Sequence, residues 1–423
     1  MSVVSELKER GLIYQYSADA LLERLNGQRV VCYVGFDPTA ESLHLGNLLQ
    51  IVMLRRLQLA GHRPILLAGG GTGMIGDPSG KSDERQLLDE EALDHNLARI
   101  KSQLGNFLDL SESDNGALVL DNREWLAKVS LIDFLREVGK HFSVNQMIQK
   151  DSIRSRLEER EQGISYTEFS YMLLQSYDFL HLFDNYDCEL QLGGSDQWGN
   201  ITSGIDLIRR TRQKLAYGLT LPLVTKADGT KFGKSESGAI WLDPKKTSPY
   251  SLYQFFIRAE DEMVASYLKI FSFVGLAEIK ELEEEGRKNP QDRLMQKRLA
   301  FEMTSYVHGP KEANRALEAS EALYSGSLIG KDPEVIRMAL SEAPSLKISA
   351  KDLEPGLSIE ELLARSPLVG SKGEARRVVS QGGVYINEER ASVGKVVDAS
   401  HSLDGSVILL RRGKKDYCLV ELT

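Results

Sequence analysis

A histidine lies where an expected strand meets an expected helix, and this position suits the binding of a phosphate. The run Arg29–Val34 is rich in β-branched residues and predicts a buried strand. Leu48–Ala60 predicts a helix that Gly61 closes. His44 and Asn47 lie between the two, where free backbone N–H groups and the helix dipole favour a phosphate. A surface turn histidine is the alternative, and these residues alone leave it open.

A second candidate site is a polar stripe on a helix expected to begin at Ser165. Ser165 and Glu168 form a capping box. Tyr171, Gln175 and Asp178 then fall on one face of the helix, within roughly 60° of each other. Their neighbours are apolar or aromatic, so this helix should be mostly buried and its polar groups must be satisfied. An internal or water-filled network would do this, but a small polar ligand is the better fit.

Two lysines flank a glycine further along the chain, in the run Lys231, Phe232, Gly233, Lys234 and Ser235. Cations on an exposed loop can close over a triphosphate and neutralise charge that builds up in a transition state. A solvated loop is the alternative interpretation. The position of this run downstream of the histidine favours the phosphate role.

The glycine-rich segment from Gly69 to Ser82 comes close to two nucleotide-binding motifs without matching either. Gly71, Gly73 and Gly76 have the dinucleotide-binding spacing and follow a strand, but Asp77-Pro78 interrupts the helix that should carry the third glycine. The run that ends at Lys81 and Ser82 is one residue too short for a Walker A loop. The segment therefore argues against a nicotinamide enzyme and a P-loop NTPase.

Length and composition indicate a globular protein of two or three domains. The chain has 423 residues, 42% hydrophobic and 27% charged. No run approaches the ~18 apolar residues of a membrane span, so we expect no membrane partner. The three scattered cysteines fit a reducing cytoplasm and argue against a disulfide framework or a zinc site.

The charge is unevenly distributed along the chain. The net charge is −9, yet from Leu357 onward ten Lys/Arg stand against nine Asp/Glu. An acidic body with a locally basic tail suggests that any nucleic acid is bound at selected patches. The tail cations that could contact RNA phosphates are Arg376, Arg377, Arg411, Arg412, Lys414 and Lys415.

Alternating strands and helices predict an α/β protein with a Rossmann-like, doubly wound parallel sheet. We expect this domain to span residues 1–247, with an insertion at about 118–163. An α-helical domain at 248–330, a linker at 331–355 and a small α+β domain at 356–423 should follow.

The histidine motif and the lysine motif together resemble the two signatures of class I aminoacyl-tRNA synthetases. His44-Leu45-Gly46-Asn47 resembles the HIGH-type motif, with Asn47 in place of the second histidine, and Lys231 to Ser235 resembles the KMSKS-type loop. The helix between them makes the chain similar to bacterial tyrosyl-tRNA synthetases over nearly its whole length. The resemblance implies a tyrosine–tRNA ligase that forms tyrosyl-adenylate from tyrosine and ATP and then charges tRNA(Tyr). A tryptophanyl-type synthetase and a non-catalytic RNA-binding paralogue are the alternatives.

The resemblance also implies roles for individual residues. Tyr33 and Asp178 would bind the phenolic hydroxyl of tyrosine, and the remaining tyrosine-binding residues would be Asp77, Tyr171, Gln175, Gln191 and Gln197. The ATP site would comprise Gly35, Asp37, Thr39, His44, Gly46, Asn47, Gly193, Asp196, Lys231, Lys234 and Ser235. The residues that stabilise the transition state would be His44, Asn47, Lys231, Lys234, Lys81 and Arg85.

Partners and cofactors follow from the same resemblance. Magnesium should arrive with ATP, because no cluster of protein metal ligands is visible in the sequence. In relatives the insertion at 118–163 forms the interface of a homodimer, so we expect a homodimer here; packing of this apolar face within the same chain is the alternative that the sequence leaves open. The small domain at 356–423 resembles an RNA-binding module that also occurs in a ribosomal protein and in pseudouridine synthases.

Overall fold

The computed structural model describes most of the chain. The described residues are 2–77, 89–150, 153–154, 157, 164–230, 232–235, 238–325, 328, 330–341, 343–403, 405–413 and 416–423. They divide into two compact units, one of Met1–Thr247 with Ala259–Leu299 and one of Ser248–Arg258 with Ala300–Thr423. The helical region that we expected as one domain at 248–330 is thus shared between the two units.

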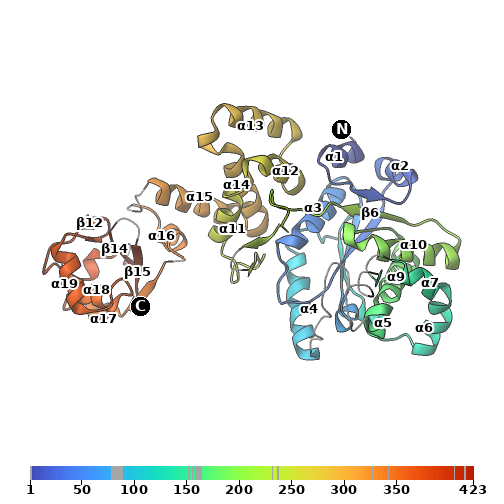
Figure 1. Ribbon diagram of the computed structural model, residues 1–423, viewed down its shortest axis with the longest axis horizontal. Coiled ribbons are helices and arrows are strands. Elements are labelled where there is room, and N and C mark those ends of the chain that lie inside the picture. Colours follow the sequence, from blue (N-terminus) through green and yellow to red (C-terminus); the bar gives the residue numbers. More distant parts are fainter. Residues whose placement is uncertain are drawn as a thin grey trace. The chain divides into compact units, whose positions relative to one another are not determined.

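The first unit is built on a six-stranded sheet with the strand order β1-β6-β5-β2-β3-β4 (Figure 1). The strands are β1 (Gln15–Tyr16), β2 (Val31–Phe36), β3 (Arg63–Ala68), β4 (Leu118–Asp121), β5 (Cys188–Gly194) and β6 (Tyr217–Leu221). All neighbours pair in parallel except β1 and β6. This arrangement confirms the predicted doubly wound α/β fold.

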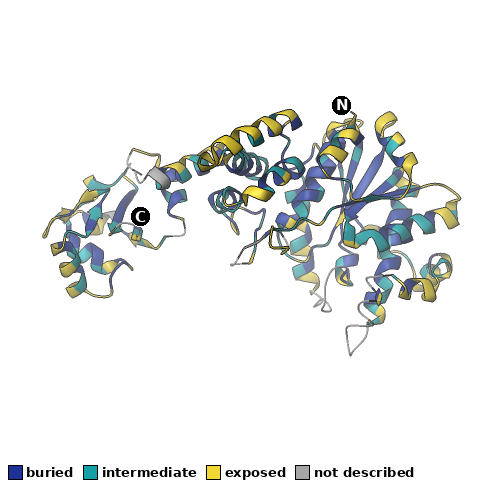
Figure 2. Ribbon diagram, turned by 45° about the horizontal axis from the view of Figure 1, so that its top comes forward, coloured by how far each residue is buried: buried dark blue, intermediate teal, exposed yellow. Residues whose placement is uncertain are grey.

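Helices cover the sheet of the first unit. Its helices are α1 (Val3–Glu9), α2 (Asp19–Gly27), α3 (Leu45–Leu59), α4 (Glu90–Leu104), α5 (Arg123–Leu126), α6 (Leu131–Glu137), α7 (Val144–Ile148), α9 (Tyr166–Tyr186), α10 (Trp198–Arg212), α12 (Asp261–Phe271) and α13 (Leu276–Lys288). Helices α3 and α4 pack against β3, whereas α9 and α10 pack against β5. Figure 2 shows the strands as buried and the outward helix faces as exposed.

Local sequence explains where the two most informative helices begin. His44 is the N-cap of α3: its Nδ1 accepts a hydrogen bond from the Gly46 N–H, and the Asn47 side chain accepts one from the His44 N–H. Helix α3 therefore begins three residues earlier than the expected Leu48. Ser165 caps α9 through the Glu168 N–H, which confirms the predicted start of that helix.

The expected insertion differs from the structure at its start. Residues 118–121 form β4, which pairs with β3 at the edge of the sheet. Trp125, on α5, is part of the sheet's hydrophobic core. The correction has a physical reason: Leu118 and Leu120 pack against this core, so the segment cannot leave the sheet before α5.

The second unit contains a helical part and a small sheet. Its helices are α11 (Pro249–Ile257), α15 (Pro310–Ser325), α16 (Pro333–Ala339), α17 (Ala350–Leu353), α18 (Ile359–Arg365) and α19 (Lys372–Ser380), and the division between the units falls within α14 (Leu294–His308). The small sheet has the order β12-β11-β14-β15-β9, with β9 (Ser345–Ile348), β11 (Val384–Ile386), β12 (Glu389–Arg390), β14 (Val407–Arg412) and β15 (Asp416–Leu422). Two short pairs complete the strands, β10 (Leu357–Ser358) with β13 (Val396–Val397), and in the first unit β7 (Lys234–Ser235) with β8 (Gly238–Ala239).

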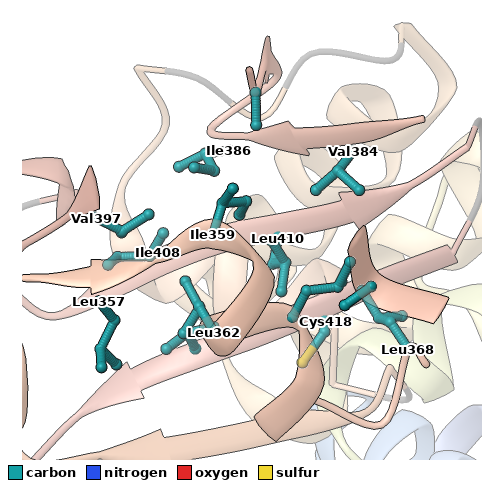
Figure 3. Close-up of a cluster of buried hydrophobic side chains, with 14 of the residues drawn as sticks. Leu357, Ile359, Leu362, Leu368, Val384, Ile386, Val397, Ile408, Leu410 and Cys418 are labelled. Atoms are coloured by element: carbon teal, nitrogen blue, oxygen red, sulfur yellow. The ribbon is translucent and has the colours of Figure 1, made fainter. Parts of the chain in front are cut away.

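The segment 331–355, expected as a linker, is largely folded. It contains α16, β9 and α17, and β9 pairs in parallel with β15. Ile348 and Leu353 belong to the same core as Leu362 and Leu410, part of which Figure 3 shows. The correction follows from this core, because removing β9 would expose an edge of the sheet and two buried side chains.

Among the described residues, no helix is long and apolar enough to cross a membrane.

Candidate active site

A cavity of about 530 Å³ opens where β2 and β5 end, next to the N-terminus of α3. Ligands of open α/β sheets bind at this position, beyond the carboxyl ends of the strands. The lining residues are Tyr33, Val34, Gly35, Phe36, Asp37, Thr39, Ala40, Ser42, Leu43, His44, Asn47, Gln50, Leu67, Gly69, Thr72, Asp77, Ile100, Asn122, Tyr171, Gln175, Asp178, Gln191, Leu192, Gly193, Asp196, Gln197 and Trp241.

The inner end of the cavity holds polar atoms that the protein leaves unpaired. Tyr33 on β2 is 1% exposed and Gln191 on β5 is 2% exposed. Neither the Tyr33 hydroxyl nor the Gln191 Oε1 has a hydrogen-bond partner within the described part of the chain. Burial and the nearby Asp178 raise the pKa of Tyr33 well above its ordinary value, so the hydroxyl keeps its proton. An unpaired buried polar atom points to a ligand that satisfies it.

Asp178 faces the same end of the cavity and is held by two donors. The Asn122 amide donates to its Oδ2 at 2.8 Å, and the Trp125 indole N–H donates to its Oδ1 at 2.7 Å. Burial raises the pKa of Asp178 to about 7, and Asp37 and Asp121 act in the same direction. The two donated hydrogen bonds oppose this shift, because they stabilise the ionised carboxylate.

A chain of hydrogen bonds runs along the middle of the cavity. Gln175 on α9 donates to Gln197 Oε1 at 3.2 Å, and Gln197 donates to Asp77 Oδ2 at 2.8 Å. The Tyr171 hydroxyl donates to Asp37 Oδ2 at 3.2 Å. These side chains come from α9, the β5–α10 turn and the segments after β2 and β3, and they present both donors and two carboxylates to the cavity.

The outer end of the cavity is formed by the start of α3. In this first turn the N–H groups of Leu45 and Gly46 already donate to the Ile240 carbonyl and to His44 Nδ1, so the turn offers an anion the His44 side chain and the positive end of the helix dipole. Gly46 is required here, because a Cβ at this position would lie 2.8 Å from His44 Cε1. The ring of His44 lies 6.2 Å from the ring of Trp241, and both residues line the cavity.

The backbone brings the loop that carries Gly233, part of the lysine motif, next to the histidine motif. Leu45 N–H donates to the Ile240 carbonyl, and Leu242 N–H donates to the Leu43 carbonyl. A Cβ built on Gly233, where φ is +90°, would lie 3.3 Å from the Gly46 nitrogen. The loop that carries the motif therefore lies against the first turn of α3, although the two motifs are far apart in sequence.

The structure gathers most of the expected site residues around one cavity. All seven expected tyrosine-binding residues line it, together with Gly35, Asp37, Thr39, His44, Asn47, Gly193 and Asp196 of the expected ATP site. Gly46 lies beside them in the first turn of α3. Lys81, Arg85 and Lys231 lie outside the described residues, and Lys234 and Ser235 are described only as the backbone of β7.

Sequence reasoning missed several residues of the site. Thr72 and Asn122 line the cavity, Trp125 holds Asp178, and Trp241 lies beside His44. Asn122 follows the carboxyl end of β4, so recognising 118–121 as a strand would have indicated it. In the described chain, no group of three or more His, Cys, Asp or Glu is placed to hold a metal ion.

The expected RNA-binding cations lie in the second unit. Arg376 and Arg377 are exposed on α19. Arg412 donates to Glu374 at 3.1 Å and to the Leu368 carbonyl, whereas the Arg411 guanidinium lies on the Tyr385 ring. Lys414 and Lys415 lie outside the described residues.

Two family models match the chain. Residues 25–325 match class I tRNA synthetases of the W and Y type, and residues 335–420 match the C-terminal domain of tyrosine–tRNA ligases. Among curated relatives, the tyrosine–tRNA ligase of Roseiflexus castenholzii is 52% identical over 100% of this chain and 99% of its own. That of Bacillus caldotenax is 50% identical over 99% of each chain.

Solved structures give the same result for the fold. A C-terminally truncated mitochondrial tyrosyl-tRNA synthetase from Aspergillus nidulans has a TM-score of 0.69 and 32% identity, covering 76% of this chain and 94% of that one. A tryptophanyl-tRNA synthetase from Encephalitozoon cuniculi has a TM-score of 0.55 at 13% identity, over 80% of this chain and 92% of that one. The second similarity concerns the fold alone.

Proposed function

Because the chain belongs to the class I tRNA synthetases of the tryptophan and tyrosine type and is a tyrosine–tRNA ligase, we propose that it activates tyrosine in the cavity of the six-stranded sheet. The tyrosine carboxylate attacks the α-phosphate of ATP, and the products are tyrosyl-adenylate and pyrophosphate. A ribose hydroxyl at the 3′ end of tRNA(Tyr) then takes the tyrosyl group. The curated relatives support this specificity and not the tryptophanyl or non-catalytic alternatives.

One observation carries the assignment of the tyrosine site: the unpaired Tyr33 hydroxyl and the Asp178 carboxyl meet at the buried end of the cavity. A phenolic hydroxyl is both a donor and an acceptor. It can donate to Asp178 while it accepts from Tyr33, so tyrosine satisfies both groups at once. An apolar side chain of the same size would leave the Tyr33 hydroxyl unpaired and would give Asp178 no hydrogen bond from the ligand.

The remaining groups fit the other parts of the substrates. Asp77, Tyr171 and Gln175 offer a carboxylate and polar atoms to the ammonium group of tyrosine, and Gln197 lies next to them, towards the α-phosphate. The N-terminus of α3, with His44 and Asn47, takes the ATP phosphates, and Asp196 takes the ribose. No side chain here needs to act as a nucleophile, so catalysis rests on positioning and on donors that favour the charge of the transition state.

In this proposal magnesium comes with the nucleotide, bound to the ATP phosphates. The free, buried Cys32, Cys188 and Cys418 fit a cytoplasmic location.

The insertion forms a homodimer interface in this proposal. Leu131 is 69% exposed and Ile132 is 71% exposed on α6, and Val144 on α7 is also exposed. Large exposed apolar side chains on neighbouring elements are typical of a contact surface. Light scattering on the full chain tests this. Ile132→Asp should convert a dimer into a monomer. Lys140→Asp also introduces an aspartate in this region, at a residue that is already charged, and should leave the dimer intact.

The activity is tested by amino-acid-dependent exchange of pyrophosphate into ATP with each of the twenty amino acids, followed by charging of tRNA(Tyr). Tyrosine should support both steps. Exchange with tryptophan at a higher rate than with tyrosine would contradict the proposal.

A further inference from the structure

Four side chains form a row across the small sheet of the second unit. Tyr385 on β11 pairs with Arg390 on β12 and with Arg411 on β14, and Arg411 pairs with Tyr417 on β15. Directly opposed residues of antiparallel strands point to the same face of a sheet. Cations and aromatic rings therefore alternate along one line, which we call the Tyr/Arg row.

The guanidinium group of Arg411 is stacked within this row. It lies 3.9 Å from the centre of the Tyr385 ring and 5.8 Å from the centre of the Tyr417 ring. Its Nε has no hydrogen-bond partner in the parts of the chain that the structure describes. Arg411 thus packs on the Tyr385 ring near Tyr417, and its Nη1 donates to the Gly413 carbonyl, which differs from an extended cation that reaches for a phosphate.

The Tyr/Arg row lies at one end of a face of the small sheet, and its side chains are partly exposed. On the opposite face, Ile408, Leu410 and Cys418 pack into the hydrophobic core (Figure 3). On the same face as the row, the next pair along the strands, Leu409 and Leu419, is buried. The row itself retains access to solvent, and Arg390 is exposed.

Planar side chains and positive charge that occur together on a surface are typical of a site that binds unpaired nucleobases. Aromatic rings on a sheet stack on unpaired nucleobases, Arg guanidinium planes do the same, and cations attract the nucleic-acid backbone. A site for phosphates alone has no use for the two rings. We propose that the Tyr/Arg row binds an unpaired base of tRNA by stacking; this deepens the proposed function, because tRNA is the substrate.

A stacking site and a phosphate site differ in their dependence on salt. Losing a phosphate contact flattens the plot of log affinity against log salt by about one unit, whereas losing a stacked base leaves the slope unchanged. Tyr385→Leu should weaken the binding of a tRNA(Tyr) transcript to the full-length protein about tenfold with the wild-type slope. Arg377→Ala, on the exposed face of α19, is the matched control and should lower the slope.

A fluorescent base reports stacking directly. A single-stranded RNA of ten nucleotides with one 2-aminopurine should be quenched by the wild-type protein and by Tyr417→Phe, which keeps the ring. Tyr385→Leu and Tyr417→Leu should not quench it. Should Tyr385→Leu lower the unfolding temperature, Arg411→Lys serves instead, because it keeps the charge and removes the planar group.

The proposal is overturned if all variants bind tRNA and quench the probe as the wild type does, since the row would then serve only the sheet's own stability. It is also overturned if Tyr385→Leu lowers the salt slope as Arg377→Ala does. Tyrosyl-adenylate formation should be normal in every variant. If the wild type itself forms no adenylate, the proposed function fails and the stacking result stands apart from it.

Discussion

The carboxyl group of Asp178 is 2% exposed and is held by the donors Asn122 and Trp125. Burial raises its pKa to about 7 from an ordinary value of 3.8. Between these two pH values the folded protein keeps a proton that the unfolded chain has released. The stability of the folded state therefore falls as the pH rises from about 4 to about 7, and the loss is complete above that range.

Asp178→Asn separates this effect from other titrations. The free energy of unfolding of the variant, relative to the wild type, should increase between pH 5 and pH 8 by about 3 kcal/mol, because the amide does not ionise. Chemical denaturation of both proteins at the two pH values measures it. A difference that does not change with pH would mean that Asp178 is already ionised in the folded protein at pH 5.

The sequence indicated some site residues and could not indicate others. Tyr171, Gln175 and Asp178 could be found from the sequence, because polar residues with a helical period on an otherwise apolar helix are a local signal. Asn122 and Trp125 touch Asp178 from more than fifty positions away. No local pattern records such a contact, which arises only when β4 and α5 join the sheet.

At the scale of elements, one residue of α3, its N-cap His44, serves both the stability of the helix and the proposed chemistry. His44 caps the helix with its Nδ1, and it also lines the cavity. Removing the His44 side chain should therefore lower both stability and the rate of catalysis. A side chain that caps the helix but lacks the imidazole should restore the stability alone.

His44→Ala should lower the free energy of unfolding by about 1 kcal/mol through the lost cap. It should also lower the rate of adenylate formation by about 10²-fold or more through the lost donor. His44→Asn should recover stability but not rate, because Asn caps helices well and lacks the imidazole. Stopped-flow adenylate formation and thermal unfolding of the three proteins check this; recovery of the rate by Asn would show that the cap alone matters.

The loop that carries the second motif should be sensitive at Gly233. Its φ of +90° strains any other residue, and a Cβ would press on the first turn of α3. Gly233→Ala should slow adenylate formation and leave tyrosine binding, measured by equilibrium dialysis, close to normal. Gly229→Ala is the control, because Gly229 has a similar φ of +79° but no atom within 4 Å of the added Cβ. If the two changes had equal effects, the contact with α3 would not be the cause of the slower adenylate formation.

Elements with a clear local signal were predicted well. The strand at 31–36 and the start of the helix at 166–186 are confirmed within a few residues. The pairing of Leu43 and Leu45 with Leu242 and Ile240 could not be predicted, because it is a long-range backbone contact. Strand β9 was missed for the same reason: four residues give no periodic signal, and its partner β15 follows seventy residues later.

At the scale of the whole molecule, the two units suggest a division of labour. The activation cavity lies in the first unit, and the small sheet with its basic helix lies in the second. A tRNA must be held against a chain of net charge −9, which requires local cations.

A chain that ends at Ser325 should form tyrosyl-adenylate at close to the full-length rate but charge tRNA poorly. The cut removes the whole small sheet, including β9, and leaves the cavity intact. Single-turnover activation and tRNA charging at moderate salt measure the two steps. Normal charging by the shortened chain would mean that the small sheet does not hold tRNA during the reaction.

The central claim is that Tyr33 and Asp178 read the phenolic hydroxyl of the substrate, and one ratio tests it most directly. Phenylalanine leaves the Tyr33 hydroxyl buried and unpaired and takes one hydrogen bond from Asp178, at about 1–3 kcal/mol each, so kcat/KM for pyrophosphate exchange should favour tyrosine by at least about 30-fold. Tyr33→Phe should reduce this ratio by about tenfold, mainly through a lower value for tyrosine. Equal values of kcat/KM for tyrosine and phenylalanine in the wild type, or a ratio that Tyr33→Phe leaves unchanged, would contradict the account.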